Sequence, residues 1–228
     1  GKSTSGVSHQ ANWQIPQGVT ASNWEYAQAN HISTGYDKFL LDDPLTMVDR
    51  QILARYLPDL TNGGEKSPNG SKPLVADFGC GNGRTLIPLL NRGYAGVGID
   101  LSIPMLNAFQ KKIGIDPNRE ELGSNTGEND CFWIQANLVE LEGIVDGAFD
   151  HGLSLFSTLG MIRGHENRLL FLRHARRTIK PGGWFILHAH NVWYQLRYPG
   201  GLRWALGNGL RAIRGKSEFG DRESNYRG

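Results

Sequence analysis

The sequence lacks the features that mark several large classes of protein. It holds two cysteines, Cys80 and Cys131, in 228 residues, which excludes a disulfide framework and leaves too few thiols for a zinc cluster. Lys and Arg total 24 against 22 Asp and Glu, a balance that favours neither a nucleic-acid-binding nor a membrane-surface protein. No apolar run approaches the roughly 18 residues of a membrane span, and no signal-peptide hydrophobic region follows the N-terminus. We expect a cytoplasmic globular chain with no nucleic-acid partner and no membrane span.

Glycine is the residue that the sequence has in excess. There are 30 glycines in 228 residues, against an average near 7% in globular proteins. The sequence has no collagen period, low-complexity tract or internal repeat, so the glycines indicate places where backbone turns sharply or approaches something closely.

The order of patterns divides the chain into five regions. Residues 1–12 are polar and begin with Gly rather than Met, which predicts a disordered tail and the removal of an upstream piece. Three- and four-residue spacings of apolar side chains predict a helical cap over residues 13–60. Residues 61–73 are a turn-rich linker, residues 74–191 alternate strand and helix, and residues 192–228 are basic and rich in Gly and Arg.

The clearest helix of the predicted cap covers residues 44–57. One apolar stripe runs along it, made up of Leu45, Val48, Ile52, Leu53 and Tyr56. We expect this stripe to face the core.

The alternating region predicts a doubly wound α/β fold with a parallel sheet. The expected strands are residues 74–78, 95–100, 131–135, 149–156 and 184–188, in the sheet order 3-2-1-4-5. A helix follows the first strand and contains Pro88, which predicts a bend and a lost hydrogen bond. Another helix follows Ser102, a good N-cap residue, with Pro104 in its first turn.

The first strand ends in an acid and is followed by alternating glycines. Asp77 precedes Gly79, Gly81 and Gly83, and a helix comes next. Such glycines bring backbone N–H groups against a ligand at a helix N-terminus. Dinucleotide-binding folds space their glycines G-x-G-x-x-G, which would require glycine where Arg84 stands. The spacing therefore disfavours an NAD(P)-dependent oxidoreductase, which remains the lesser alternative.

A second acid, Asp100, ends the second strand 23 residues after Asp77. A carboxylate at this place can accept hydrogen bonds from both hydroxyls of a ribose. Alone, it is as well explained as a turn residue, but its distance from the glycine loop favours a nucleoside site.

Taken together, these segments resemble the class I S-adenosylmethionine-dependent methyltransferases over roughly residues 74–190. The run Asp77-Phe78-Gly79-Cys80-Gly81-Asn82-Gly83 is similar to the family's first motif, and Gly98-Ile99-Asp100-Leu101-Ser102 to its second. Gln135-Ala136-Asn137-Leu138 is similar to the third, with Asn137 where Asp is common. Residues 149–158 resemble the fourth, and Ile179-Lys180-Pro181-Gly182-Gly183 the turn before the fifth strand.

The resemblance implies a Rossmann-like fold with S-adenosylmethionine as cofactor. Its glycines would surround the methionine part, Asp77 would hold the ammonium group, and Asp100 would take the ribose hydroxyls. Leu101 would lie against the adenine, Asn137 would meet its amino group, and Leu155 and Phe156 would face the reacting methyl. The implied cofactor-binding set is Tyr36, Asp77, Gly79, Gly81, Gly83, Asp100, Leu101, Asn137, Leu138, Leu155 and Phe156.

Two histidines near the end of the last expected strand are the candidate catalytic residues. His188 and His190 are alternate residues and should point to the same side, where one could act as a general base. The commoner explanation is a hydrogen-bonded histidine at a strand end. Two ligands are too few for a metal site, so no metal is expected.

The acceptor is expected to be a small molecule. The Asn-Pro-Pro-aromatic run of nucleic-acid amino methyltransferases is absent, and Phe156-Ser157-Thr158-Leu159 stands in its place. A methyltransferase-like module that binds cofactor or a partner without turnover is the alternative.

The family's final two strands have no convincing counterpart after His190. We expect a chain that is cut short, or a homo-oligomer or completing partner at the edge of the fifth strand. Residues 201–213 predict a helix with an apolar stripe beside several arginines, compatible with an anionic substrate or membrane surface, although a solvated basic face is commoner.

Overall fold

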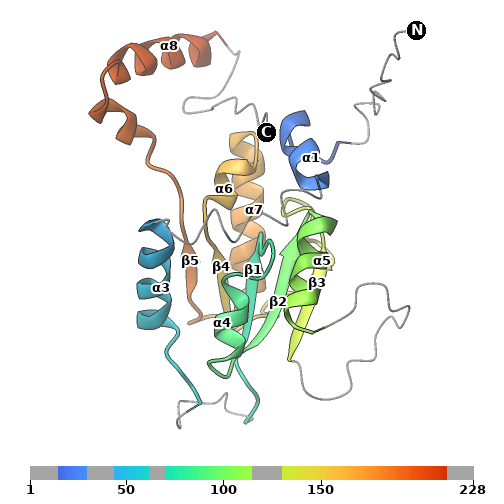
Figure 1. Ribbon diagram of the computed structural model, residues 1–228. Helices are drawn as coiled ribbons and strands as arrows, with labels where there is room; N and C mark the ends of the chain where they lie inside the picture. Colours follow the sequence, from blue (N-terminus) through green and yellow to red (C-terminus); the bar gives the residue numbers. More distant parts are fainter. Residues whose placement is uncertain (1–14, 30–43, 62–69, 115–129, 215–228) are drawn as a thin grey trace, which may run out of the picture.

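Five parallel strands form the centre of the molecule (Figure 1). The computed structural model describes residues 15–29, 44–61, 70–114 and 130–214. The sheet order is β3-β2-β1-β4-β5, which confirms the predicted fold class and topology. The strands are β1 (Leu74–Phe78), β2 (Ala95–Asp100), β3 (Cys131–Gln135), β4 (His151–Ser154) and β5 (Phe185–Leu187).

The first three strands have the predicted bounds, whereas β4 and β5 are shorter than predicted. The chain leaves β4 after Ser154 because Phe156 takes a left-handed backbone conformation, with φ of 52°. At the other end, Phe149 makes only an isolated bridge with Ile179. Within the described residues, β5 pairs with β4 alone.

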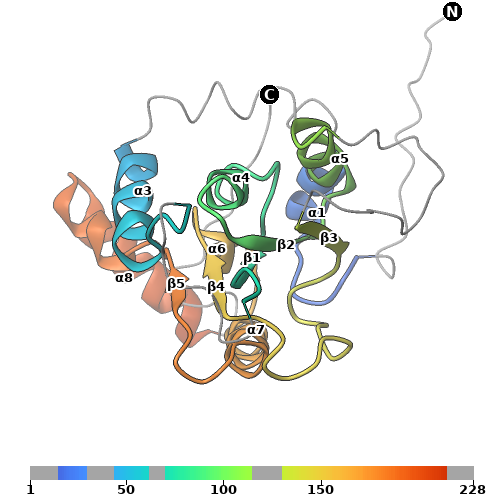
Figure 2. The same ribbon diagram turned by 90° about the horizontal axis from the view of Figure 1, so that it is seen from below.

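Helices cover both faces of the sheet (Figure 2). On one face lie α3 (Pro44–Tyr56), α4 (Leu86–Leu90) and α5 (Ile103–Lys112), and on the other lies α7 (His165–Thr178). Each face has its own apolar cluster, one built on Val75 and Leu153 and the other on Ala76 and Phe78. Consecutive side chains of β1 thus pack on opposite faces of the sheet, because side chains alternate in direction along a strand.

Helix α3 belongs to this helical layer, and its buried face was predicted only in part, correctly for Leu53 and wrongly for three other residues of the stripe. Leu45, Val48 and Ile52 are exposed, while Thr46, Asp49 and Leu53 are buried. Leu53, with Leu57 after the helix, joins the core cluster of Val75. The face of the helix that carries Asp49 is turned inward instead, and the Asp49 carboxylate lies near Arg84 and His188 there.

The predicted bend at Pro88 does not occur, because α4 begins at Leu86 rather than directly after the glycine loop. Pro88 therefore sits in the first turn, where a backbone N–H has no partner within the helix. Ser102 caps α5 as predicted, accepting a hydrogen bond from Met105 N at 3.3 Å.

A short helix, α1 (Ala21–Gln28), lies at the carboxyl end of the strands, near α6 (Thr158–Met161) (Figure 1). Hydrogen bonds attach it and the preceding turn to the domain, three of them close to the helix itself. Ser102 Oγ donates to Ala27 O at 2.6 Å, Asn23 Nδ2 to Met161 O at 2.9 Å, and Arg163 N to Gly18 O at 2.7 Å. Of the described residues of the predicted cap, this part overlies the carboxyl edge of the sheet.

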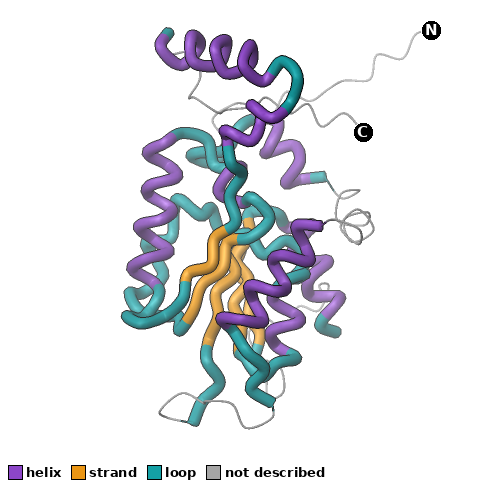
Figure 3. Tube along the Cα trace, turned by 90° about the vertical axis from the view of Figure 1, so that its left-hand side faces the viewer, coloured by secondary structure: helices purple, strands orange, loops and turns teal. Residues whose placement is uncertain are grey.

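After β5 the chain forms η2 (Val192–Arg197) and α8 (Gly201–Ile213), which stand away from the sheet (Figure 3). The bounds of α8 are those predicted from the sequence. Its exposed stripe consists of Leu202, Leu206, Leu210 and Ile213. None of the described helices is long and apolar enough to cross a membrane.

Candidate functional site

The glycine loop joins β1 to α4 and is anchored on β2. The N–H groups of Gly79 and Cys80 both donate to Ile99 O, at 2.7 and 3.1 Å. Gly81 and Gly83 have positive φ, of 53° and 78°, but their surroundings differ. A Cβ on Gly83 would lie 2.1 Å from Phe109, whereas one on Gly81 would meet nothing within 4 Å. Gly83 is thus required by packing, and Gly81 borders open space.

Two carboxylates stand on either side of this loop, one buried (Asp77) and one half-buried (Asp100). Asp77 is 2% exposed at the end of β1, and burial raises its pKa to about 7, with Arg84 lowering it and Asp100 raising it. Burial likewise raises the pKa of Asp100, while hydrogen bonds from backbone N–H groups oppose the rise. These hydrogen bonds come from Gly81 N to Oδ2 and from Ser102 N to Oδ1, both at 2.8 Å. Poorly solvated carboxylates of this kind favour a cationic or hydroxyl-bearing ligand.

The segment after β4 forms the opposite wall. Leu155 is buried, and Phe156 and Ser157 have φ of 52° and 66°, which is uncommon for residues other than glycine. Strain of this kind clusters at functional sites. The guanidinium of Arg84 lies 5.2 Å from the centre of the Phe156 ring, across the pocket.

The pocket between the two walls brings together several of the predicted residues. It is lined by Asp77, Gly79, Cys80, Gly81, Arg84, Thr85, Leu155, Phe156 and Thr158. Cys80 is no nucleophile here, because burial raises the pKa of its thiol well above the ordinary value.

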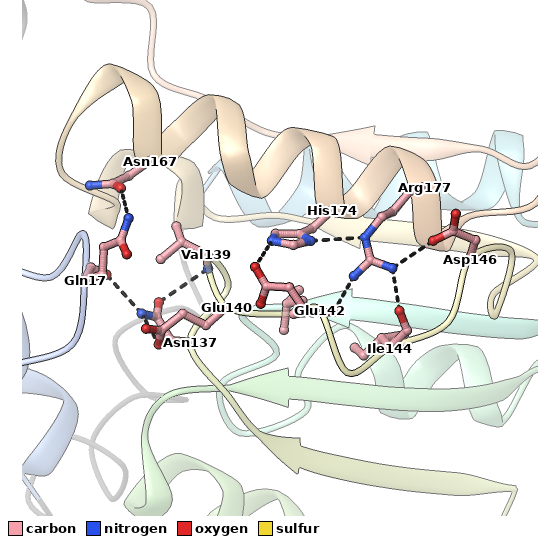
Figure 4. A network of polar contacts seen from close by, with 11 residues as sticks. Gln17, Asn137, Val139, Glu140, Glu142, Ile144, Asp146, Asn167, His174 and Arg177 are labelled. Atoms are coloured by element: carbon pink, nitrogen blue, oxygen red, sulfur yellow. Dashed lines mark hydrogen bonds and ion pairs between the residues drawn. The ribbon is translucent and has the colours of Figure 1, made fainter.

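Further along the edge, Asn137 is held by the N-terminal segment (Figure 4). Its Nδ2 donates to Gln17 O at 3.0 Å and to Glu140 Oε2 at 2.9 Å, while Oδ1 lies 3.4 Å from Val139 N. The next residue, Leu138, is buried in the core, and Leu101 is half-buried after β2. Both donors of the Asn137 amide are thus occupied, which leaves Oδ1 as the atom available to a ligand donor.

The two candidate catalytic histidines lie together just beyond β5. Their ring centres are 6.1 Å apart, and His188 N donates to Ser154 O at 3.0 Å. His188 is largely buried and His190 is exposed. Tyr36, the remaining predicted residue, lies outside the described residues.

Two residues at this edge were missed by the sequence reasoning. Asp49 of α3 is buried, with Oδ1 lying 3.3 Å from His188 Nδ1 and Oδ2 lying 3.8 Å from Arg84 Nη2. The amphipathic pattern of the helix did not indicate that Asp49 would be buried, because both of its partners come from distant parts of the chain. Arg84 was noted only as the residue that breaks the dinucleotide spacing.

Comparison with known proteins identifies the domain. A family profile described as "Methyltransferase domain" matches residues 76–187. YqeM of Bacillus subtilis (strain 168), which carries a methyltransferase name, is 25% identical over 120 residues, or 53% of this chain and 43% of that protein.

Two solved structures share the fold at low identity. The CcbJ methyltransferase from Streptomyces caelestis has a TM-score of 0.51 and 22% identity, covering 71% of this chain and 57% of its own. A chain of the Haloferax volcanii complex between the Trm112 methyltransferase activator and a methyltransferase has a TM-score of 0.50 and 21% identity, covering 68% and 57%. The chain thus spans about half the length of these relatives.

The five-stranded sheet and the loop after β1 define the Rossmann-like class of methyltransferase folds. Residues 76–187 belong to the methyltransferase domain family, and their fold is that of the class I S-adenosylmethionine-dependent methyltransferases.

Proposed function

We propose that this chain binds S-adenosylmethionine at the β1–β2–β4 edge and transfers its methyl group to a small-molecule acceptor. The observation that carries the proposal is the pair of carboxylates, buried Asp77 and half-buried Asp100, beside the open backbone of Gly81. Bound there, the cofactor supplies an electrophilic methyl on a sulfonium, whose departure leaves a neutral thioether.

The chemistry of the pocket fits such a ligand. Asp77 is buried and its charge is incompletely compensated, so it would hold the ammonium of the methionine part. Asp100 uses one bond on each carboxylate oxygen for Gly81 and Ser102, and the remaining lone pairs would accept the two ribose hydroxyls. Gly81 allows the ligand to approach the backbone because no side chain stands there.

The remaining predicted residues would complete the cofactor site. Leu101 and Leu138 would contact the adenine, and Oδ1 of Asn137 would accept from its amino group. Leu155 and Phe156 would lie beside the reacting methyl, excluding water from it. Gly79 and Gly83 would shape the loop, and we assign Tyr36 to the same site by resemblance alone.

Calorimetry tests cofactor binding. Replacing Asp100 with Ala should abolish measurable S-adenosylmethionine binding, because it removes the carboxylate proposed to accept from the ribose hydroxyls and the acceptor that holds Gly81 N. Asp130→Ala is the matched control. Asp130 is exposed and pairs with Lys72 at the amino end of the strands, away from the proposed site. Equal affinities for wild type and Asp100→Ala would contradict the proposal.

Turnover is tested with a mixed panel of phenols, amines and carboxylic acids, read by mass spectrometry. Formation of S-adenosylhomocysteine with at least one acceptor supports the enzyme. Cofactor binding without product for any small molecule favours the alternative of a binding module without turnover.

A further inference from the structure

A polar cluster lies beside the pocket, and Arg84 is its one member that also lines the pocket described above. It joins Asp49 of α3, Arg84 from the glycine loop and His188 after β5, whose side chains are 5%, 16% and 17% exposed. The Asp49 carboxylate is at the centre, with one oxygen toward each partner.

The cluster adjoins the place where the methyl acceptor would enter. Arg84 lines the pocket and lies over the Phe156 ring. The backbone of His188 is hydrogen-bonded to Ser154, two residues before Phe156. His188 is therefore at the carboxyl edge between β4 and β5, on the side of the pocket opposite Asp100.

Desolvation restricts which ring nitrogen of His188 carries the proton. Nδ1 of His188 is buried from solvent and makes no hydrogen bond within the described residues, and Asp49 Oδ1 lies 3.3 Å away, close enough to accept from it after a small rotation of either side chain. A carboxylate accepts but does not donate, so a neutral His188 should carry its proton on Nδ1. Nε2 then keeps its lone pair. Among the described residues, the other charged or titratable groups near the ring are Arg84, beyond Asp49, and His190.

We propose that Asp49 is a positioning residue that holds His188 as the general base for the methyl acceptor. The inference rests on the proposed function. When an acceptor arrives with an X–H bond, its proton passes to Nε2 of His188 and the freed electron pair of X forms the bond to the methyl carbon. The electrons of the broken sulfur–carbon bond stay on sulfur, and His188 afterwards releases the proton to water.

Arg84 determines how an amide side chain at position 49 would orient, which allows the effect of Asp49→Asn to be predicted. In Asp49→Asn the amide has one acceptor and one donor side, and Arg84 carries only donors. The amide oxygen should turn to Arg84 and the NH₂ group to Nδ1. The variant should therefore force the proton of His188 onto Nε2, the wrong tautomer for a base facing the acceptor.

Two-bond ¹H–¹⁵N spectra report the tautomer directly, with the His188 signals assigned through His188→Gln. We expect the Nδ1–H form in the wild type, the Nε2–H form in Asp49→Asn, and an unchanged spectrum in Asp130→Asn. An Nε2–H tautomer in the wild type overturns the inference, and this result does not depend on whether the variant folds.

Kinetics with the best acceptor of the panel give the second readout. Asp49→Asn and His188→Gln should each lower kcat by roughly 10²-fold or more, with cofactor affinity unchanged and little further loss in the double variant. Unchanged kcat in both variants would show that the contact between Asp49 and His188 only supports the structure. Absence of cofactor binding in the wild type would instead overturn the proposed function itself, and this inference with it.

Discussion

Asp77 links the charge of the ligand to the pH of the solution. Burial raises its pKa to about 7, so at lower pH a proton must leave before the carboxylate can pair with an ammonium group. We predict that S-adenosylmethionine binds about three- to tenfold more weakly at pH 6 than at pH 8. Calorimetry in buffers of different ionisation enthalpy should record the proton release. Asp77→Asn should bind weakly at both pH values, and a wild-type affinity that is flat with pH contradicts the prediction.

The same carboxylate makes the ligand-free protein less stable as pH rises. The folded-state pKa of Asp77 is above the unfolded value of 3.8, so the folded state holds more protons between these values and stability falls with increasing pH. Asp77→Asn has no carboxyl group at this position, so its stability does not fall with pH for this reason. Its stability relative to the wild type should grow by about 2 kcal/mol between pH 5.5 and pH 8. Urea unfolding at both values measures the difference, which should be absent in Asp130→Asn.

At the scale of the element, the glycine loop needs glycine for two reasons, access of the ligand to the backbone at Gly81 and close packing at Gly83. Separate substitutions can distinguish the two. Gly81→Ala meets no neighbour and should cost about 1 kcal/mol for its positive φ, while lowering cofactor affinity at least tenfold. Gly83→Ala drives a Cβ into the Phe109 ring and should cost about 2–4 kcal/mol. Urea unfolding and calorimetry distinguish them. Adding Phe109→Leu should recover part of the loss for Gly83→Ala alone, and equal losses of stability in both single variants would contradict this division.

The elements that sequence reasoning predicted well are those determined by nearby residues. Ser102 caps α5, and the bounds of β1 and β2 follow from apolar runs that end in Asp77 and Asp100. The orientation of α3 could not be found in this way, since the burial of Asp49 depends on Arg84 and His188, 35 and 139 residues further along the chain. Asn137 was placed correctly after β3, but its contact with Gln17 depends on how the N-terminal segment docks.

At the scale of the whole molecule, residues 15–29 connect the two halves of the carboxyl edge. Gln17 contacts Asn137 after β3 and Asn167 of α7, and Ala27 contacts Ser102 at the start of α5 (Figure 4). These residues overlie the edge at which we propose the cofactor binds. We predict that cofactor binding slows hydrogen exchange in peptides covering residues 15–29 by at least fivefold. Peptides from α8, which stands apart from the sheet, should exchange at an unchanged rate.

Asn137→Asp tests this docking without the cofactor, although it introduces the residue common in the family. An Asp cannot donate to Gln17 O, and it places a second carboxylate beside Glu140, whose Oε2 now lies 2.9 Å from the amide nitrogen. The loss of about 1–2 kcal/mol should raise exchange in residues 15–29 roughly five- to thirtyfold. Asn191→Asp is the control, because that side chain only accepts, from Trp193 N, and the carboxylate can do the same. Unaltered exchange in Asn137→Asp would mean that the contacts of Gln17 with Asn167 and of Asn23, Ala27 and Gly18 hold the segment without Asn137, so that Asn137 would be available to a ligand rather than committed to the N-terminal segment.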